Sequence, residues 1–147
     1  MHLDWEKLVK RYVWHDERTP YFTRVRNLSA VQARYELLAY CLFTGVFFAV
    51  LSVAGLSNKL PHGNAAIVPI YAFTVTCAAL ILGVLRARWA SLYCAAAPLG
   101  MVAYFAVYGF PDGLSGMDHA LIIFVMLAWF AYSLRVVAVA AAFPRRA

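Results

Sequence analysis

The sequence predicts an all-α membrane protein, a bundle of four transmembrane helices preceded by an amphipathic helix at the membrane surface. Of its 147 residues, 64% are hydrophobic and 14% are charged, whereas a soluble domain has about 45–50% apolar and about 25% charged residues. The segment from Leu37 to Asn58 carries no formal charge. As a helix it would cover roughly 30 Å, the thickness of a bilayer's hydrocarbon core. It shows no polar stripe of the kind that marks a helix in a soluble core. Three further apolar runs follow.

Residues 1–28 are expected to form a basic arm and linker outside the membrane. Within them, residues 3 to 14 place apolar side chains at the spacing of one helical face. A basic, aromatic amphipathic helix of this kind lies in the headgroup plane of an anionic leaflet. The residues expected to contact the membrane surface there are Trp5, Lys7, Lys10 and Arg11. Docking of the same helix on a partner protein is the alternative, and the sequence does not separate the two.

The membrane domain is expected to occupy residues 29–147. Ser29 and Gln32 have the spacing of a capping box, so Ser29 is predicted to cap a helix that continues into a first span at about 35–57. This helix is longer than a bilayer requires. Its first two turns, with Arg34 and Glu36, are therefore expected in the water or among the headgroups.

The second and third spans are predicted at about 64–85 and 89–110. Only three residues separate them, which predicts a tight antiparallel hairpin. Pro98, near the middle of the third span, is expected to kink its helix. Ala96 and Gly100 form a small-xxx-small pair that would let a neighbouring helix approach closely. Ala96, Pro98 and Gly100 are thus predicted helix-packing residues.

The fourth span is predicted at about 117–138. Ser115 and Asp118 make a second candidate capping box, and the helix should run to about Phe143. Arg135 interrupts this apolar run, roughly 28 Å along the helix from Gly116. We expect it to reach the headgroups at the inner interface. The apolar residues beyond it need a cover, from the N-terminal helix, from a partner or through tilting of the span.

The basic residues predict the orientation. Eleven of the 13 lysines and arginines lie before the first span, between spans two and three or at the C-terminus, which four spans place on one side. The positive-inside rule puts that side, with both termini, in the cytoplasm. The Ala- and Arg-rich composition suggests a bacterial inner membrane. Because topology accounts for the net charge of +6, no nucleic-acid partner is expected.

No catalytic, cofactor or metal signature stands out. Cys41, Cys77 and Cys94 contain no Cys-x-x-Cys pair and are expected to pack as small apolar residues. None of the four histidines falls deep within a span, which argues against b-type haem. Four residues of the outer loops could converge on a metal, but their spacing matches no known site; they are His62, Asp112, Asp118 and His119.

Aromatic residues of the last two spans suggest a possible groove for a lipid or quinone. Its predicted residues are Tyr104, Tyr108, Trp129 and Tyr132. Packing between helices, with hydroxyls bonded to neighbouring backbones, explains the same residues equally simply and more commonly.

The leading functional hypothesis is a non-catalytic accessory or assembly subunit of a larger respiratory or photosynthetic membrane complex. Its expected partners are the lipid bilayer and other membrane subunits. The first alternative is a small membrane protein that binds a lipid, a quinone or a neutral solute, or a homo-oligomeric transporter. A membrane enzyme acting through His62, Asp118 and His119 is the second alternative.

Overall fold

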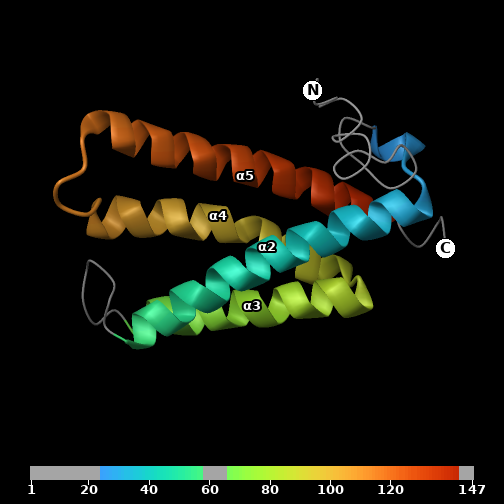
Figure 1. Cartoon of the computed structure of the whole chain (residues 1–147), viewed down its shortest axis with the longest axis horizontal. Helices are drawn as coiled ribbons and strands as arrows, with labels where there is room; N and C mark the ends of the chain where they lie inside the picture. The colour runs from blue at the N-terminus through green and yellow to red at the C-terminus, as the bar shows by residue number, and fades with distance from the viewer. Residues whose placement is uncertain (1–23, 58–65, 143–147) are drawn as a thin grey trace, which may run out of the picture.

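A computed structural model describes residues 24–57 and 66–142 of the chain, and four long helices account for most of them. They are α2 (Ala30–Leu56), α3 (Ile67–Leu85), α4 (Arg88–Tyr108) and α5 (Gly116–Ala142), preceded by a short 3-10 turn, η1 (Val25–Asn27) (Figure 1). Each of the four is long and apolar enough to cross a membrane. The chain is therefore an all-helical, multi-pass protein by length and composition. The amphipathic helix predicted for residues 3 to 14, with Trp5, Lys7, Lys10 and Arg11, lies outside the described residues.

Both predicted capping boxes are present. The Gln32 backbone N–H donates to Ser29 Oγ over 3.1 Å, and the Ser29 backbone N–H donates to Gln32 Oε1 over 3.0 Å. At α5, the backbone N–H and hydroxyl of Ser115 both donate to Asp118 Oδ2, over 2.9 and 2.8 Å. These bonds satisfy N–H groups that have no partner inside a helix, and they fix where α2 and α5 begin.

The hairpin between α3 and α4 is as tight as predicted. Arg86 ends α3 in the left-handed region, with φ of 53°, and donates its N–H to the Leu82 carbonyl. Ala87 then returns to an extended conformation and α4 begins at Arg88. Pro69 is the third residue of α3, where its missing N–H removes no intrahelical bond, so it does not interrupt the helix.

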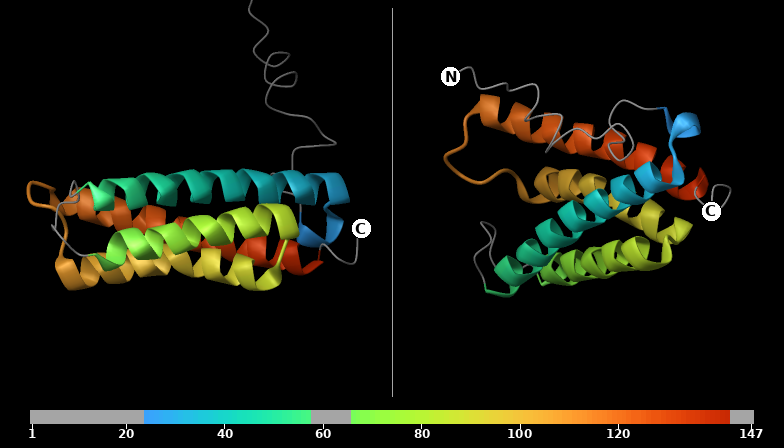
Figure 2. Two further views of the ribbon diagram at one scale, coloured as in Figure 1. Left: turned by 90° about the horizontal axis from the view of Figure 1, so that it is seen from below. Right: turned by 45° about the vertical axis from the view of Figure 1, so that its right-hand side comes forward.

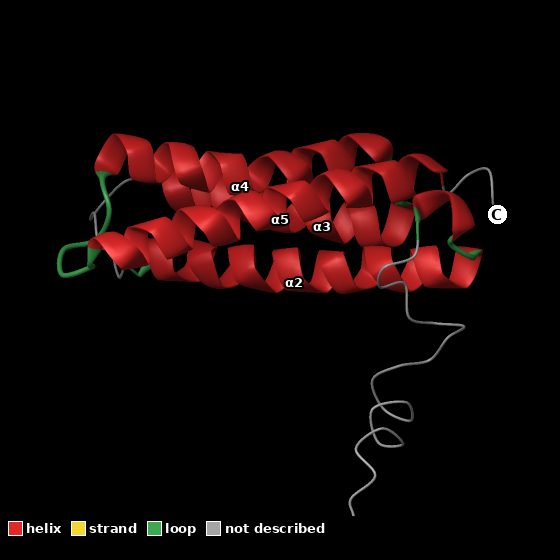
Figure 3. Cartoon of the chain, turned by 90° about the horizontal axis from the view of Figure 1, so that it is seen from above, coloured by secondary structure: helices red, strands yellow, loops and turns green. Residues whose placement is uncertain are grey.

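Consecutive helices pack against one another, and α5 returns to contact α2. All four lie along one long axis and are joined by short loops wherever the connection is described (Figure 3). α2 runs diagonally, from the C-terminal end of α5 to the N-terminal end of α3 (Figures 1 and 2). The described arginines all lie at or near one end of the bundle, where α2 and α4 begin and α3 and α5 end; they are Arg24, Arg26, Arg34, Arg86, Arg88 and Arg135. We call this the arginine end.

Small residues let α2 and α3 approach each other closely. A Cβ placed on Gly45 would lie 3.6 Å from the Cβ of Ala79, and one on Gly83 would lie 3.6 Å from the Cβ of Cys41. Each helix therefore carries small residues four positions apart, and the two pairs face each other in antiparallel register. Close backbone approach through such residues is a main source of helix association in lipid, where burying apolar surface gains little.

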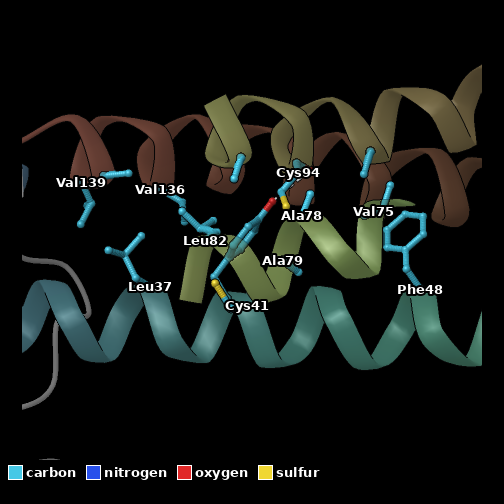
Figure 4. Close-up of a cluster of buried hydrophobic side chains, with 14 of the residues drawn as sticks. Leu37, Cys41, Phe48, Val75, Ala78, Ala79, Leu82, Cys94, Val136 and Val139 are labelled. Atoms are coloured by element: carbon cyan, nitrogen blue, oxygen red, sulfur yellow. Dashed lines mark hydrogen bonds between the residues drawn. The ribbon is translucent and has the colours of Figure 1, made fainter. Parts of the chain in front are cut away.

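At the arginine end, the last turns of α5 are covered from within the chain. Val136 and Val139 are 0% and 1% exposed, and both point toward Leu37 of α2 (Figure 4). The segment around η1 contacts α5 and adds the buried Leu28 to the same cluster. Within the described residues, η1 and α2 thus cover this part of α5, and neither was among the covers expected from the sequence.

We predict that Gly45→Leu destabilises the bundle while Gly45→Ala is tolerated. Alanine would make an ordinary contact with Ala79, whereas leucine would push α2 and α3 apart, at a cost of about 1–3 kcal/mol. Thermal unfolding in detergent measures the difference. Val46→Leu, at a 61% exposed neighbouring position, is the matched control and should leave the unfolding temperature unchanged. Equal effects of the two leucine substitutions would contradict the close packing.

Candidate functional site

A row of buried residues runs the length of α2 at intervals of four. Its members are Gln32, Glu36, Tyr40, Thr44, Phe48 and Ser52, and all but Phe48 have a polar group. Residues four apart turn by about 40° per step around a helix. The row therefore faces α5 near the arginine end and α3 at the other end, where Ser52 Oγ donates to the Pro69 carbonyl over 3.0 Å. The sequence indicated no polar stripe on this helix, and the structure corrects that expectation. The buried row is such a stripe, and it turns around α2 as the helix follows its diagonal path.

The charged member of the row is paired with Arg135. Arg135 Nε donates to Glu36 Oε1 over 2.6 Å, and Nη2 donates to Oε2 over 3.2 Å, which is a bidentate geometry. The Glu36 side chain is 1% exposed and that of Arg135 is 27% exposed. Glu36 is therefore enclosed by protein. The expectation that it would lie in water or among the headgroups was wrong. The pair neutralises both charges inside an apolar bundle, where an unpaired charge is costly.

One turn farther along the row, Tyr40 compensates for Pro98. A proline has no N–H, so Pro98 leaves the carbonyl of Cys94, four residues earlier, without its helical donor. The Tyr40 hydroxyl lies 3.1 Å from that carbonyl oxygen and 2.8 Å from Ser133 Oγ. Ser133 Oγ in turn lies 2.8 Å from the Trp129 carbonyl. Three contacts share two hydroxyl protons, and together they join α2, α4 and α5 in the buried interior.

Trp129 occupies the centre of an aromatic cluster. Its ring centroid lies 5.1, 5.2 and 5.9 Å from those of Phe43, Phe47 and Phe48. Trp129 Nε1 and the hydroxyl of Thr44 are buried without a hydrogen-bond partner. The cluster therefore fixes the indole through ring packing, not through its N–H.

An open groove of about 420 Å³ lies between α2 and α5, lined by Ala39, Tyr40, Phe43, Val125, Trp129 and Tyr132. We call it the α2–α5 groove. Tyr40 and Trp129 form buried parts of its wall, while Phe43, Val125 and Tyr132 are 58%, 49% and 37% exposed. Its lining is almost wholly apolar. The Glu36–Arg135 pair lies about one helical turn from it, toward the arginine end.

The aromatic residues predicted from the sequence fall into two places. Trp129 and Tyr132 line the α2–α5 groove, beside Tyr40, whose ring centroid is 6.1 Å from that of Tyr132. Tyr104 and Tyr108 lie on α4, with ring centroids 5.0 Å apart, and are not among the lining residues. The structure therefore does not join all four in one groove.

The three predicted packing residues of α4 also differ in their surroundings. Pro98 is buried, and a Cβ on Gly100 would lie only 2.6 Å from the Tyr71 hydroxyl, so a larger residue there would displace the Tyr71 side chain of α3. Ala96, in contrast, is exposed on the surface of the chain. Ala97, the next residue, is 0% exposed and takes the place within the bundle.

At the end opposite the arginines, Asp118 and His119 have local roles. Asp118 caps α5, and the imidazole of His119 stacks on Phe110 with ring centroids 4.2 Å apart. Within residues 24–57 and 66–142, no three His, Cys, Asp or Glu side chains come close enough to hold a metal. His62 lies outside these residues.

The sequence alone did not single out Tyr40 or Ser133, and it did not pair Glu36 with Arg135. A signal existed: polar residues recur every fourth position from Gln32 to Thr44, and α5 carries one charge of opposite sign. No protein-family model matches this chain, and searches of curated proteins and of solved structures likewise find no match.

We predict that the cost of Tyr40→Phe depends on Pro98. Alone, Tyr40→Phe leaves the Cys94 carbonyl unsatisfied and should cost about 0.6–1.7 kcal/mol, the usual range for a hydrogen bond between membrane helices. In a Pro98→Ala background, the restored N–H can bond that carbonyl, so the same change should cost less. A double-mutant cycle by reversible unfolding measures this coupling. Additive effects would contradict it, and Tyr35→Phe, at an exposed tyrosine, is the control.

We predict an asymmetry between the two charged partners. Arg135→Ala leaves a carboxylate that is 1% exposed without its cation and should cost about 3–5 kcal/mol. Glu36→Ala leaves an arginine that can extend toward the headgroups, so its cost should be smaller. Adding Glu36→Gln to Arg135→Ala should recover part of the loss. Thermal unfolding of the four proteins tests the order, and equal costs for the two alanine variants would contradict it.

Proposed function

We propose that this chain is a non-catalytic accessory or assembly subunit of a larger membrane complex, such as a respiratory or photosynthetic assembly of a bacterial inner membrane. The observation that supports the proposal is a stripe of exposed residues along α4. They recur at intervals of three and four and are Trp89, Leu92, Ala96, Leu99, Ala103 and Ala106. We call them the α4 stripe.

The α4 stripe has the composition of a helix-packing surface. Leu92 and Leu99 are 59% and 43% exposed, and they alternate with the exposed Ala96 and Ala103. Small side chains let a second helix approach closely, and the leucines beside them supply the flanking contacts. Small residues at these positions do not improve contact with lipid, whereas they do let another membrane helix pack closely. The exposure of Ala96 within the chain is therefore consistent with packing against another subunit.

The positions of the arginines support the proposed orientation. The described arginines gather at one end of the bundle, and Asp112 and Asp118 lie at the other. By the positive-inside rule, we propose that the arginine end and both termini are cytoplasmic. A basic cytoplasmic face would then be available to other subunits of the complex.

The test is photo-cross-linking in native membranes from a photoreactive residue at position 96, with position 80 as the control. Leu80 is 64% exposed on α3, away from the α4 stripe. We expect position 96 to give one discrete heteromeric product, whose partner also co-purifies in stoichiometric amount. Products at both positions alike, or a product containing only this chain, would contradict the proposal.

A matched substitution separates docking from folding. Ala96→Leu with Ala103→Leu should reduce co-purification of that partner about tenfold or more, because the helices can no longer approach closely. Both positions are exposed, so the unfolding temperature should not change. Unchanged co-purification would overturn the assignment of the α4 stripe.

A further inference from the structure

We propose that the α2–α5 groove binds one acyl chain of an anionic phospholipid from the leaflet at the arginine end, with the lipid phosphate beside Arg135. This site is separate from the α4 stripe, so it does not depend on the proposed function. The proposal rests on the size and lining of the groove, on its distance from Arg135 and on which half of the ion pair faces outward.

The groove has the size of a chain-binding site. Its volume of about 420 Å³ lies within the range of about 300–1,000 Å³ that is typical of small-ligand pockets. A helix about 10 Å across fills roughly the same volume in one 5.4 Å turn. A helix seated within this volume would fill it in one turn, whereas one extended hydrocarbon chain can lie along the walls formed by Phe43 and Trp129.

The charge beside the groove is directed outward. In the Glu36–Arg135 pair, the carboxylate side chain is 1% exposed and the guanidinium side chain is 27% exposed. The surface therefore presents the cationic partner, while the carboxylate remains inside. Other described arginines at the same end, among them Arg24, Arg26 and Arg34, strengthen the positive potential there. An anionic headgroup complements this surface.

The depth of the site is consistent with one lipid molecule. Trp129 lies six residues before Arg135 on α5, about 9 Å along the helix axis, and Tyr132 lies between them and lines the groove. A phosphate beside Arg135 would thus place the first half of its acyl chain against Trp129. The hydrocarbon and the headgroup are then contacted by consecutive turns of the same helix.

Tryptophan quenching tests the proposal in the full-length chain. A variant that keeps Trp129 alone (Trp5→Phe, Trp14→Phe, Trp89→Phe) is reconstituted in vesicles of phosphatidylcholine. Part of the lipid is replaced by phosphatidylglycerol or phosphatidylcholine that is dibrominated in the first half of its chain. Bromine quenches only on near contact. We expect both lipids to quench Trp129, with an apparent affinity about fivefold higher for phosphatidylglycerol, the effect of one cation near a membrane surface.

Four variants identify the source of the quenching. Ala39→Phe fills the groove and should abolish most quenching by both lipids, whereas Ala103→Phe on α4 should not. Glu36→Gln with Arg135→Gln removes both charges together, so that neither is left unpaired, and should bring the lipid preference close to one. Arg26→Gln removes a cation elsewhere at the same end and should leave most of the preference. Quenching unaffected by Ala39→Phe would overturn the groove, and equal affinities in the starting variant would overturn the anionic headgroup.

Discussion

The interior of this bundle depends on a hydroxyl from one helix replacing a hydrogen bond that a proline removes from another. In hydrocarbon, no water can satisfy a free carbonyl, so Pro98 would be costly within α4 on its own. The Tyr40 hydroxyl, 3.1 Å from the Cys94 oxygen, offsets that cost, and its contact with Ser133 brings α5 to the same point. The missing hydrogen bond in α4 thereby leads to a specific contact among three helices. Apolar packing alone cannot supply such specificity, because lipid competes equally for apolar surface.

The Glu36–Arg135 pair adds a second constraint on the same row of α2. Its geometry is bidentate, and its two residues come from helices that are distant in sequence, so it fixes α2 and α5 at one relative height. A buried ion pair is weak support for stability as such, but it excludes registers that would leave either charge alone in an apolar environment. The two contacts lie one turn apart on α2, and from there the row turns away from α5 toward α3. The diagonal path of α2 leaves room for the α2–α5 groove.

The agreement between sequence and structure is closest where the determining interactions are local. Ser29 with Gln32, and Ser115 with Asp118, set the starts of α2 and α5 through residues three positions apart. The tight hairpin at Arg86 and Ala87 follows from the small number of residues between the two apolar runs. The placement of the predicted aromatic residues depends on packing between distant helices: Trp129 and Tyr132 line the α2–α5 groove, whereas Tyr104 and Tyr108 lie apart from it on α4. Helix periodicity says which residues share a face, but not which helix that face meets. Ala96 and Ala97 show the same limit, since one residue is exposed and the next is buried.

By itself, the sequence determined four long apolar helices, the residues at which two of them begin, and the gathering of most basic residues at one end of the bundle. These properties depend on composition and on contacts between residues a few positions apart, so they can be predicted without knowing how the helices pack. Only the tertiary structure decided that Glu36 meets Arg135, that Tyr40 bonds the carbonyl released by Pro98, and that the aromatic groove opens between α2 and α5. Each of these needs the rotation and relative height of two helices, and both are set by packing among segments distant in the chain.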